Sequence, residues 1–251
     1  MLDREKPGYG NFGILADKYD KFRRGAPLEV INYFYQILKV PNPVILDVGC
    51  GTGISTRELQ RDGAKLSGLD IDAKMIKLAK EKSTETIRYI TGPANKMPFD
   101  NEQFDAVTAF SAFHWFKDAD SMAEIRRVLR TEGLFFVVNK NDAGDFKEGF
   151  RAVLKRFTEG ELPDVKKNYK PSAILSTNGF GNVRERIYET DELLTIQQAV
   201  KYFQTVSIWN LVSQDRKSEA LHALEDYCRG KSVHGLVERK INVVTVTGIK
   251  L

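Results

Sequence analysis

The chain has 251 residues, of which 42% are apolar and 29% are charged, a composition typical of a globular protein and too apolar for a disordered one. Lysine and arginine exceed aspartate and glutamate by only 38 − 34 = 4 residues, and no long basic run concentrates this excess, so nucleic-acid binding is not expected. The stretch 106–116 has no charge, glycine or proline and is too short for a membrane span, and no other such stretch reaches the roughly 18 residues that a span needs.

The cysteines and the N-terminal residues indicate the compartment. Cys50 and Cys228 form neither a zinc-binding spacing nor a disulfide framework. The first ten residues, MLDREKPGYG, are charged and contain no apolar leader segment. We therefore expect a cytoplasmic protein that binds no metal, and the sequence leaves its oligomeric state open.

Helical and strand patterns alternate along the first 140 residues. Apolar residues recur at helical spacing over 28–38, after a proline at 27 and before prolines at 41 and 43. The next predicted elements are strand 44–48, helix 54–61 ended by Gly63, strand 64–70, helix 73–82, strand 86–91, strand 104–110, helix 118–130 stopped by Gly133, and strand 133–139. This alternation predicts crossover connections and a parallel sheet covered on both faces.

The pattern loosens beyond residue 140. Helical spacing recurs over 146–157, 195–203 and 218–228, and strands are expected at 183–188 and in the tail INVVTVTGIKL. We expect the two late strands to form an antiparallel pair at the sheet edge. The predicted fold is a doubly wound, mostly parallel, seven-stranded α/β sheet with N-terminal and C-terminal helical lid segments.

One domain is expected for residues 1–251. Its predicted parts are an N-terminal helical cap (1–40), a ligand-binding core (41–140), and lid helices with the last two strands (141–251). Ligands of such sheets bind at the carboxyl ends of the strands.

Three glycines follow the first predicted strand in VILDVGCGTG, at Gly49, Gly51 and Gly53. Without Cβ atoms the main chain takes positive φ and a ligand can touch it directly. The dinucleotide fingerprint G-x-G-x-x-G places its third glycine one position later, where this chain has Ile54. A nicotinamide oxidoreductase is therefore disfavoured.

A G-x-G-x-G turn preceded by Asp47 and followed by Asp70 resembles the first motif of the class I S-adenosylmethionine-dependent methyltransferases. Two further segments, GPANKMPFDNEQFDAVTAFSAFHWF (92–116) and ADKYDKFRRGAP (16–27), are similar to the branch that includes trans-aconitate and ubiquinone-biosynthesis methyltransferases. The resemblance covers roughly residues 15–140. It implies a Rossmann-like fold and S-adenosylmethionine as the cofactor.

The resemblance also assigns residues to the cofactor. Asp70 is expected to bind both ribose hydroxyls, since a carboxylate accepts charge-assisted hydrogen bonds, and Asp72, directly before helix 73–82, is the better candidate for capping that helix. Asp47 is expected to orient the glycine turn and the methionine amino group, although a simple capping role is the alternative. Ile71 is expected to pack on adenine.

The remaining predicted cofactor contacts come from loops and from the N-terminus. Many relatives carry an acid where this chain has Pro93, so the polar adenine contacts are expected from the Ala94 backbone and the Asn95 side chain. Tyr19 and Arg23 are four residues apart, which places both on one helix face, and Arg23 is expected to bind the methionine carboxylate. A solvated helix face is the alternative for this pair. The predicted set also includes Cys50, as a small turn residue rather than a nucleophile, and Phe110.

His114 and Trp115 follow strand 104–110, where the transferable methyl group is expected to point. His114 is predicted to be the catalytic residue, orienting the acceptor or removing its proton, and packing against Trp115 is the alternative. Two other histidines, His222 and His234, have no convergent partners in the sequence, and Phe203, Trp209 and Tyr227 are expected to serve packing.

The sequence thus predicts in-line methyl transfer from S-adenosylmethionine to a small-molecule acceptor. A non-catalytic protein that uses the same pocket for regulation is the main alternative. Methylation of RNA or protein is a further one, and the modest charge argues against RNA.

Overall fold

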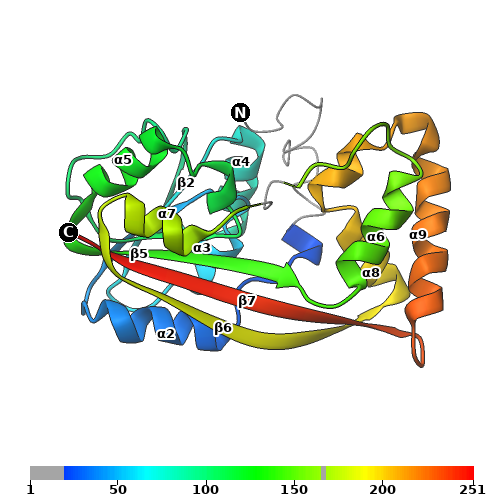
Figure 1. Cartoon of the computed structure of the whole chain (residues 1–251). Helices are drawn as coiled ribbons and strands as arrows, with labels where there is room; N and C mark the ends of the chain where they lie inside the picture. The colour runs from blue at the N-terminus through cyan, green and yellow to red at the C-terminus, as the bar shows by residue number, and fades with distance from the viewer. Residues whose placement is uncertain (1–19, 165–167) are drawn as a thin grey trace. The chain divides into compact units, whose positions relative to one another are not determined.

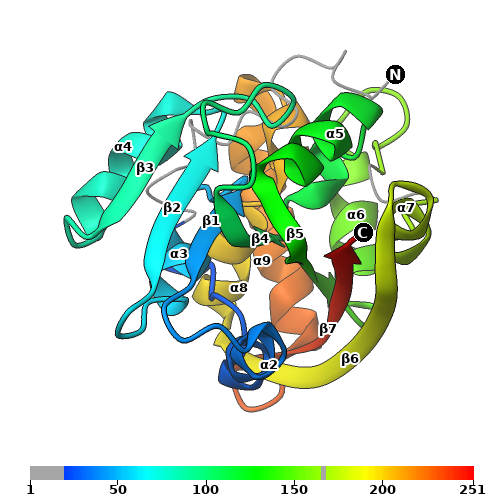
Figure 2. The same ribbon diagram turned by 90° about the vertical axis from the view of Figure 1, so that its left-hand side faces the viewer.

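The computed structural model describes residues 20–164 and 168–251. Its centre is a seven-stranded sheet in the order β3-β2-β1-β4-β5-β7-β6 (Figures 1 and 2). Strands β1 to β5 are parallel in the pairs β1·β2, β2·β3, β1·β4 and β4·β5, while β7 and β6 form the antiparallel edge pair. The predicted fold class is confirmed.

The first half of the described chain follows the predicted order closely. Its elements are α2 (Leu28–Leu38), β1 (Val44–Val48), α3 (Ile54–Glu58), β2 (Lys65–Asp70), α4 (Ala73–Lys82), β3 (Ile87–Thr91), β4 (Phe104–Phe110), the 3-10 turn η2 (Phe113–Trp115) and α5 (Ala119–Val128). Helix α3 is shorter than predicted and ends well before Gly63. The turn η2 had no counterpart among the predicted elements.

Strand β5 (Leu129–Asp142) begins earlier than predicted, because the chain is already extended at Leu129 and Gly133 does not end the preceding helix. Its pairing with β4 is irregular at this end: Phe104 lies opposite Leu129, but Ala106 lies opposite Leu134. The extra residues of β5 form a bulge, in which Glu132 has a positive φ of 61°. The predicted stop at Gly133 was therefore wrong, and the glycine lies within a bulged strand.

The core lies on both faces of the sheet. On one face Phe135 packs against Phe113 and Phe180, in a buried cluster that also contains Met122 of α5 and Leu175 of α7 (Pro171–Thr177). The neighbouring residue Phe136 points to the opposite face, where it meets Tyr33 and Phe34 of α2. Successive side chains of a strand alternate between faces, so adjacent phenylalanines supply both layers.

The two late strands are longer than the predicted segments. Strand β6 (Phe180–Thr195) contains the predicted 183–188, and β7 (Leu236–Lys250) extends the tail towards its N-terminal end. The Nζ atom of Lys250 donates to the carbonyl of Leu129 (2.6 Å), at the start of β5.

The described residues fall into two compact units. Of the described residues, 24–140, 168–188 and 243–251 form one unit, here called the sheet unit. Residues 20–23, 141–164 and 189–242 form the other, here called the helical unit. The chain passes between them within β5, β6 and β7. The single functional domain over residues 1–251, with the parts expected from the sequence, stays a prediction.

The helical unit contains α6 (Phe146–Lys155), α8 (Ile196–Phe203), η3 (Ser207–Leu211), η4 (Gln214–Arg216) and α9 (Lys217–Lys231). The rings of Phe150 and Phe203 stack at 4.2 Å, and Phe146 packs on the same ring. Trp209 is buried as well, and the hydroxyl of Tyr227 donates to the carbonyl of Phe146 at 3.3 Å. These aromatic side chains serve packing, as predicted.

Within residues 20–164 and 168–251 no helix combines the length and the apolar character that a bilayer crossing requires. The same ranges hold no cluster of histidine, cysteine and acidic side chains arranged to bind a metal ion.

Candidate functional site

The glycine turn connects β1 to α3 at the carboxyl end of the sheet. Gly49, Gly51 and Gly53 all have positive φ (71°, 55° and 78°), as predicted from their spacing. A Cβ at Gly49 would lie 2.5 Å from that of Ala112, so close packing keeps this position bare. At Gly51 a Cβ would meet no atom of the described residues within 4 Å, its chain neighbours apart. The main chain at Gly51 therefore faces open space in which a ligand can approach it.

Asp70 ends β2 directly beside this turn. One carboxylate oxygen accepts a hydrogen bond from the Gly51 amide (2.8 Å) and the other from the Asp72 amide (2.9 Å). Burial raises the pKa of this carboxyl, and the two amide hydrogen bonds oppose that effect. Each oxygen keeps a second lone pair for a further donor. The ribose role of Asp70 stays a prediction, and the carboxylate is placed to perform it.

Asp72 caps α4, as predicted. Its side chain accepts hydrogen bonds from the amides of Lys74 (2.9 Å) and Met75 (3.4 Å), in the first turn of the helix. The two carboxylates therefore have separate roles. That of Asp70 accepts a hydrogen bond from the glycine turn, and that of Asp72 caps α4.

Asp47 lies beneath the turn and is 1% exposed. Its two oxygens accept hydrogen bonds from the hydroxyls of Thr56 (2.6 Å) and Thr108 (3.0 Å). Burial raises its pKa to about 7, and the two hydroxyl hydrogen bonds only partly oppose this. Asp47 thus fastens the turn to α3 and β4. Its predicted contact with the methionine amino group stays a prediction.

Cys50 is buried inside the turn, and burial raises the pKa of its thiol well above the ordinary value. A raised pKa disfavours the thiolate, which argues against a nucleophile. Its Sγ lies 2.9 Å from where a Cβ of Gly68 would stand, so the sulfur packs on bare β2 backbone.

The residues predicted to flank adenine lie at the neighbouring strand ends. Ile71 follows Asp70 and is 63% exposed, which is unusual for an isoleucine. The amide of Gly92 donates to the carbonyl of Asp70 (2.9 Å), which ties the loop after β3 to the end of β2. Ala94 and Asn95 lie in that loop. Their backbone and side-chain contacts with adenine stay predictions.

Phe110 is the last residue of β4 and His114 lies in η2, and between them Ser111 has a positive φ of 53°. The His114 ring is 6% exposed and lies 5.0 Å from the Trp115 ring and 5.9 Å from the Tyr169 ring, measured between centroids. His114 therefore packs against Trp115, as the alternative to a catalytic role expected. A catalytic role for His114 stays a prediction.

Asn139 and Tyr169 were not identified from the sequence and lie in the same region. Asn139, near the end of β5, is 3% exposed and interacts with the Tyr169 hydroxyl. Burial raises the pKa of Tyr169, so this phenol stays protonated. The apolar run GLFFVVN ends in a polar residue, and this pattern could have identified Asn139 from the sequence. Tyr169 comes from a loop whose packing no local pattern predicts.

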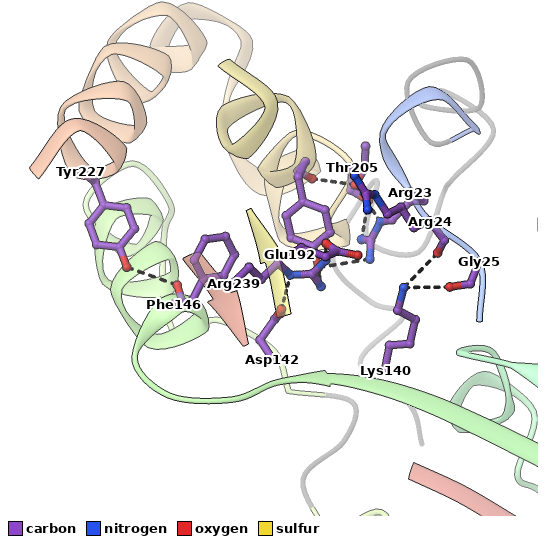
Figure 3. A network of polar contacts seen from close by, with 11 residues as sticks. Arg23, Arg24, Gly25, Lys140, Asp142, Phe146, Glu192, Thr205, Tyr227 and Arg239 are labelled. Atoms are coloured by element: carbon purple, nitrogen blue, oxygen red, sulfur yellow. Dashed lines mark hydrogen bonds and ion pairs between the residues drawn. The ribbon is translucent and has the colours of Figure 1, made fainter. Parts of the chain in front are cut away.

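Arg23 belongs to the helical unit, where its guanidinium is part of a polar network (Figure 3). It donates to the side-chain oxygen of Thr205 (2.8 Å), to the Thr205 carbonyl (3.3 Å) and to the Tyr202 hydroxyl (3.3 Å). Its predicted contact with the methionine carboxylate stays a prediction. Tyr19 lies outside the described residues.

The same network contains Arg239, which is 4% exposed. Its guanidinium pairs with Asp142 (2.5 Å) and Glu192 (2.8 Å), and it donates to the Tyr202 hydroxyl (2.5 Å) (Figure 3). Burial and the paired carboxylates act in opposite directions, and the net effect raises the pKa of Arg239. The network links β5, β6, β7 and α8.

The residues after Arg23 are anchored within the sheet unit. The Lys140 Nζ donates to the carbonyls of Arg24 and Gly25, both at 3.0 Å (Figure 3). The Glu58 carboxylate, at the end of α3, accepts from the Ala26 amide (2.9 Å). This segment is therefore fixed to the helix that follows the glycine turn.

The central part of the chain is similar to known proteins. Residues 46–137 match the family model described as "Methyltransferase domain". The demethylmenaquinone methyltransferase of Chlorobaculum tepidum is 32% identical over 138 residues, which cover 51% of this chain and 57% of that protein. The chain spans about half to three fifths of the length of several curated relatives that it matches.

Solved structures confirm the fold. A SAM-dependent methyltransferase from Aquifex aeolicus is 14% identical with a TM-score of 0.53, covering 96% of this chain and 97% of that one. Phosphoethanolamine N-methyltransferase 2 of Haemonchus contortus, solved with phosphomonomethylethanolamine and S-adenosylhomocysteine, is 17% identical with a TM-score of 0.55, covering 98% of this chain and 58% of that one. At these identities the likeness shows the fold alone.

Proposed function

We propose that this chain transfers the methyl group of S-adenosylmethionine to a small-molecule acceptor, a proposal supported by the match of residues 46–137 to the methyltransferase domain model. The observation that carries the proposal is the pairing of Asp70 with open main chain at Gly51. The proposal also includes in-line displacement at the acceptor atom and a cytoplasmic location for the protein.

The residues at the turn fit the cofactor. Apart from its two chain neighbours, no atom of the described residues lies within 4 Å of a Cβ position at Gly51, so a ligand can lie against the backbone there. The second lone pairs of the Asp70 oxygens are available to ribose hydroxyls, and the exposed Ile71 offers an apolar surface to adenine. Asp70, Ile71, Ala94 and Asn95 are the residues proposed to hold the nucleoside.

When bound, S-adenosylmethionine supplies a methyl group that is already electrophilic. The protein needs to hold the acceptor atom in line with it and exclude water, a contribution that can reach about 7 to 11 kcal/mol in favourable cases. No nucleophilic side chain is required, which agrees with the raised pKa of Cys50. The residues after β4 are proposed to orient the acceptor.

His114, Asn139 and Tyr169 are proposed to form the acceptor side of the site. They lie after β4, near the end of β5 and before α7, and the Tyr169 side chain contacts the other two. An imidazole can accept a proton from a hydroxyl or amine acceptor. A carboxylate acceptor needs no base.

The direct test is transfer of labelled methyl groups. The purified full chain is incubated with methyl-labelled S-adenosylmethionine and a panel of small hydroxylated, amino and carboxylated compounds, and S-adenosylhomocysteine and labelled product are quantified. We expect label on at least one acceptor class. Tight cofactor binding with no transfer to the panel or to a lysate small-molecule fraction favours the regulatory alternative.

His114→Asn separates catalysis from cofactor binding. We expect turnover to fall by about 10²-fold or more if the imidazole removes a proton, while S-adenosylhomocysteine affinity stays within about 2-fold. Affinity is measured by titration calorimetry and turnover by label transfer. Unchanged turnover would assign His114 to packing against Trp115 and Tyr169.

A further inference from the structure

Tyr89 of β3 lies beneath the glycine turn and is 4% exposed. Its ring passes under β2: a Cβ at Gly68 would lie 2.6 Å from a ring carbon. Its hydroxyl reaches the turn itself, 2.4 Å from where a Cβ of Gly53 would stand. Both distances are shorter than real Cβ contacts, so two glycines from different elements leave room for one side chain.

Gly68 makes this relationship specific. The glycines of the turn have positive φ, but Gly68 lies in a regular stretch of β2 and does not. A strand-interior glycine marks a close approach by another group. Here the close groups are the Tyr89 ring on one strand and the Cys50 sulfur from the turn.

A chain of polar contacts continues from the Tyr89 hydroxyl to the turn. That hydroxyl and the Ser83 hydroxyl are 3.0 Å apart, and Ser83 also accepts from the Arg57 Nη1 at 3.4 Å. The same Nη1 donates to the carbonyl of Thr52 at 2.7 Å. Thr52 lies between Gly51 and Gly53, so Tyr89 reaches the turn by direct contact and through two side chains.

The turn is therefore held from two sides. Asp70 holds it at the Gly51 amide, and Arg57 holds it at the next residue through the Thr52 carbonyl. Ligand-binding groups keep a productive geometry only when supporting residues fix them. Since the cofactor is proposed to lie against Gly51, small movements here change its binding.

We propose that Tyr89, acting through Ser83 and Arg57 and through its contact with Gly53, is a positioning residue for the cofactor-binding turn. The inference rests on the proposed function, since it assigns cofactor binding to this turn. Tyr89 touches no cofactor atom in this account. Tyr89 instead holds the turn in the conformation in which Asp70 and Gly51 can bind the ligand.

The test removes only the hydroxyl, in Tyr89→Phe, and measures S-adenosylhomocysteine affinity by titration calorimetry. We expect the dissociation constant to rise about 5-fold, the value of one net hydrogen bond. Hydrogen exchange of the unliganded protein should accelerate at the Gly51 and Gly53 amides, which donate to Asp70 and to the Cys50 carbonyl.

Tyr33→Phe is the matched control. Tyr33 is buried to a similar extent (5% exposed) in the same unit, and its ring packs against Phe136, away from the turn. We expect the S-adenosylhomocysteine affinity of this variant, and its hydrogen exchange at the Gly51 and Gly53 amides, to match those of the unmodified chain. A loss shared equally by both variants would mean general destabilisation and would overturn the proposal.

A double-mutant cycle tests the contact with Gly68. Gly68→Ala places a methyl group against the Tyr89 ring and should raise the dissociation constant about 10-fold or more. In a Tyr89→Leu background the same substitution should raise the dissociation constant by a clearly smaller factor, because the ring is gone and only the Cys50 sulfur remains close to the new methyl group. Additive effects would show that Gly68 and Tyr89 act independently.

The two proposals fail in different ways. Absence of S-adenosylhomocysteine binding by the unmodified chain contradicts the proposed function. Unchanged affinity and unchanged exchange at Gly51 and Gly53 in Tyr89→Phe contradict the positioning role, whatever the chain methylates.

Discussion

At the scale of single residues, three aspartates with similar sequence settings have three different surroundings. Asp47 accepts from two threonine hydroxyls, Asp70 accepts from the amides of Gly51 and Asp72, and Asp72 caps α4. Their carboxyl groups are chemically identical, so burial and hydrogen-bond partners alone separate their roles. Two of them yield direct tests.

Asp70→Ala should remove most of the cofactor-induced stabilisation, because it deletes the proposed ribose acceptor and releases the Gly51 amide. The measurement is the thermal shift caused by saturating S-adenosylhomocysteine. Asp72→Ala is the control: it should lower the melting temperature by the loss of a cap, about 1 kcal/mol, and keep the ligand-induced shift. An undiminished shift in Asp70→Ala would contradict the ribose assignment.

Asp47 predicts a pH dependence of stability. Its folded-state pKa of about 7 lies above the ordinary 3.8, so the folded protein holds this proton more tightly than the unfolded chain. The free energy of unfolding should therefore fall as pH rises from about 4 to about 7, and stay low above that, with a total contribution of about 4 kcal/mol.

Asp47→Asn isolates this contribution, since the amide does not ionise. Urea unfolding of both proteins at several pH values between 5 and 8 gives the difference in stability. We expect the variant to gain on the unmodified chain as pH rises. A difference independent of pH would show that Asp47 ionises at its ordinary pKa.

At the scale of elements, strands β5, β6 and β7 and helix α8 are joined by the buried Arg239. Arg239→Met removes the cation from Asp142 and Glu192, whose side chains are 15% and 8% exposed. Leaving buried carboxylates without their cation should cost about 3 to 5 kcal/mol. Chemical denaturation, with circular dichroism as the signal, measures the loss.

Arg229→Met serves as the comparison, because Arg229 on α9 pairs with Glu225 and Asp226 while its side chain is 61% exposed. Exposed pairs of this kind contribute about 1 kcal/mol or less. Equal losses in the two variants would show that the Arg239 network is no stronger than a surface pair.

At the same scale, the elements that the sequence predicted well are those with strong local patterns. Helix α4 has the predicted bounds because apolar periodicity and the Asp72 cap agree. Strand β5 was predicted too short at both ends, since its first residues are held by pairing with β4 and by Lys250, which is remote in sequence. Helix α7 was missed, and seven residues carry little periodic signal.

At the scale of the whole molecule, ligand binding should stabilise the fold selectively. S-adenosylhomocysteine at a hundredfold over its dissociation constant adds about 2.7 kcal/mol, which corresponds to a melting shift of several degrees for a chain of this size. NADH should give no shift, because Ile54 occupies the position of the third fingerprint glycine. Differential scanning fluorimetry with both ligands decides this, and an equal shift with NADH would contradict the assignment.

The sequence by itself determined the alternation of strands and helices up to residue 140, the parallel sheet, and a bare glycine turn beside Asp70. These features depend on the period of apolar residues and on residues close in sequence, which one chain displays directly. Only the tertiary structure decided that Arg23 bonds to Thr205 and Tyr202, that Asn139 meets Tyr169, and that Gly68 makes room for Tyr89. Such contacts join residues far apart in the chain, and close packing in three dimensions selects them without leaving a local pattern.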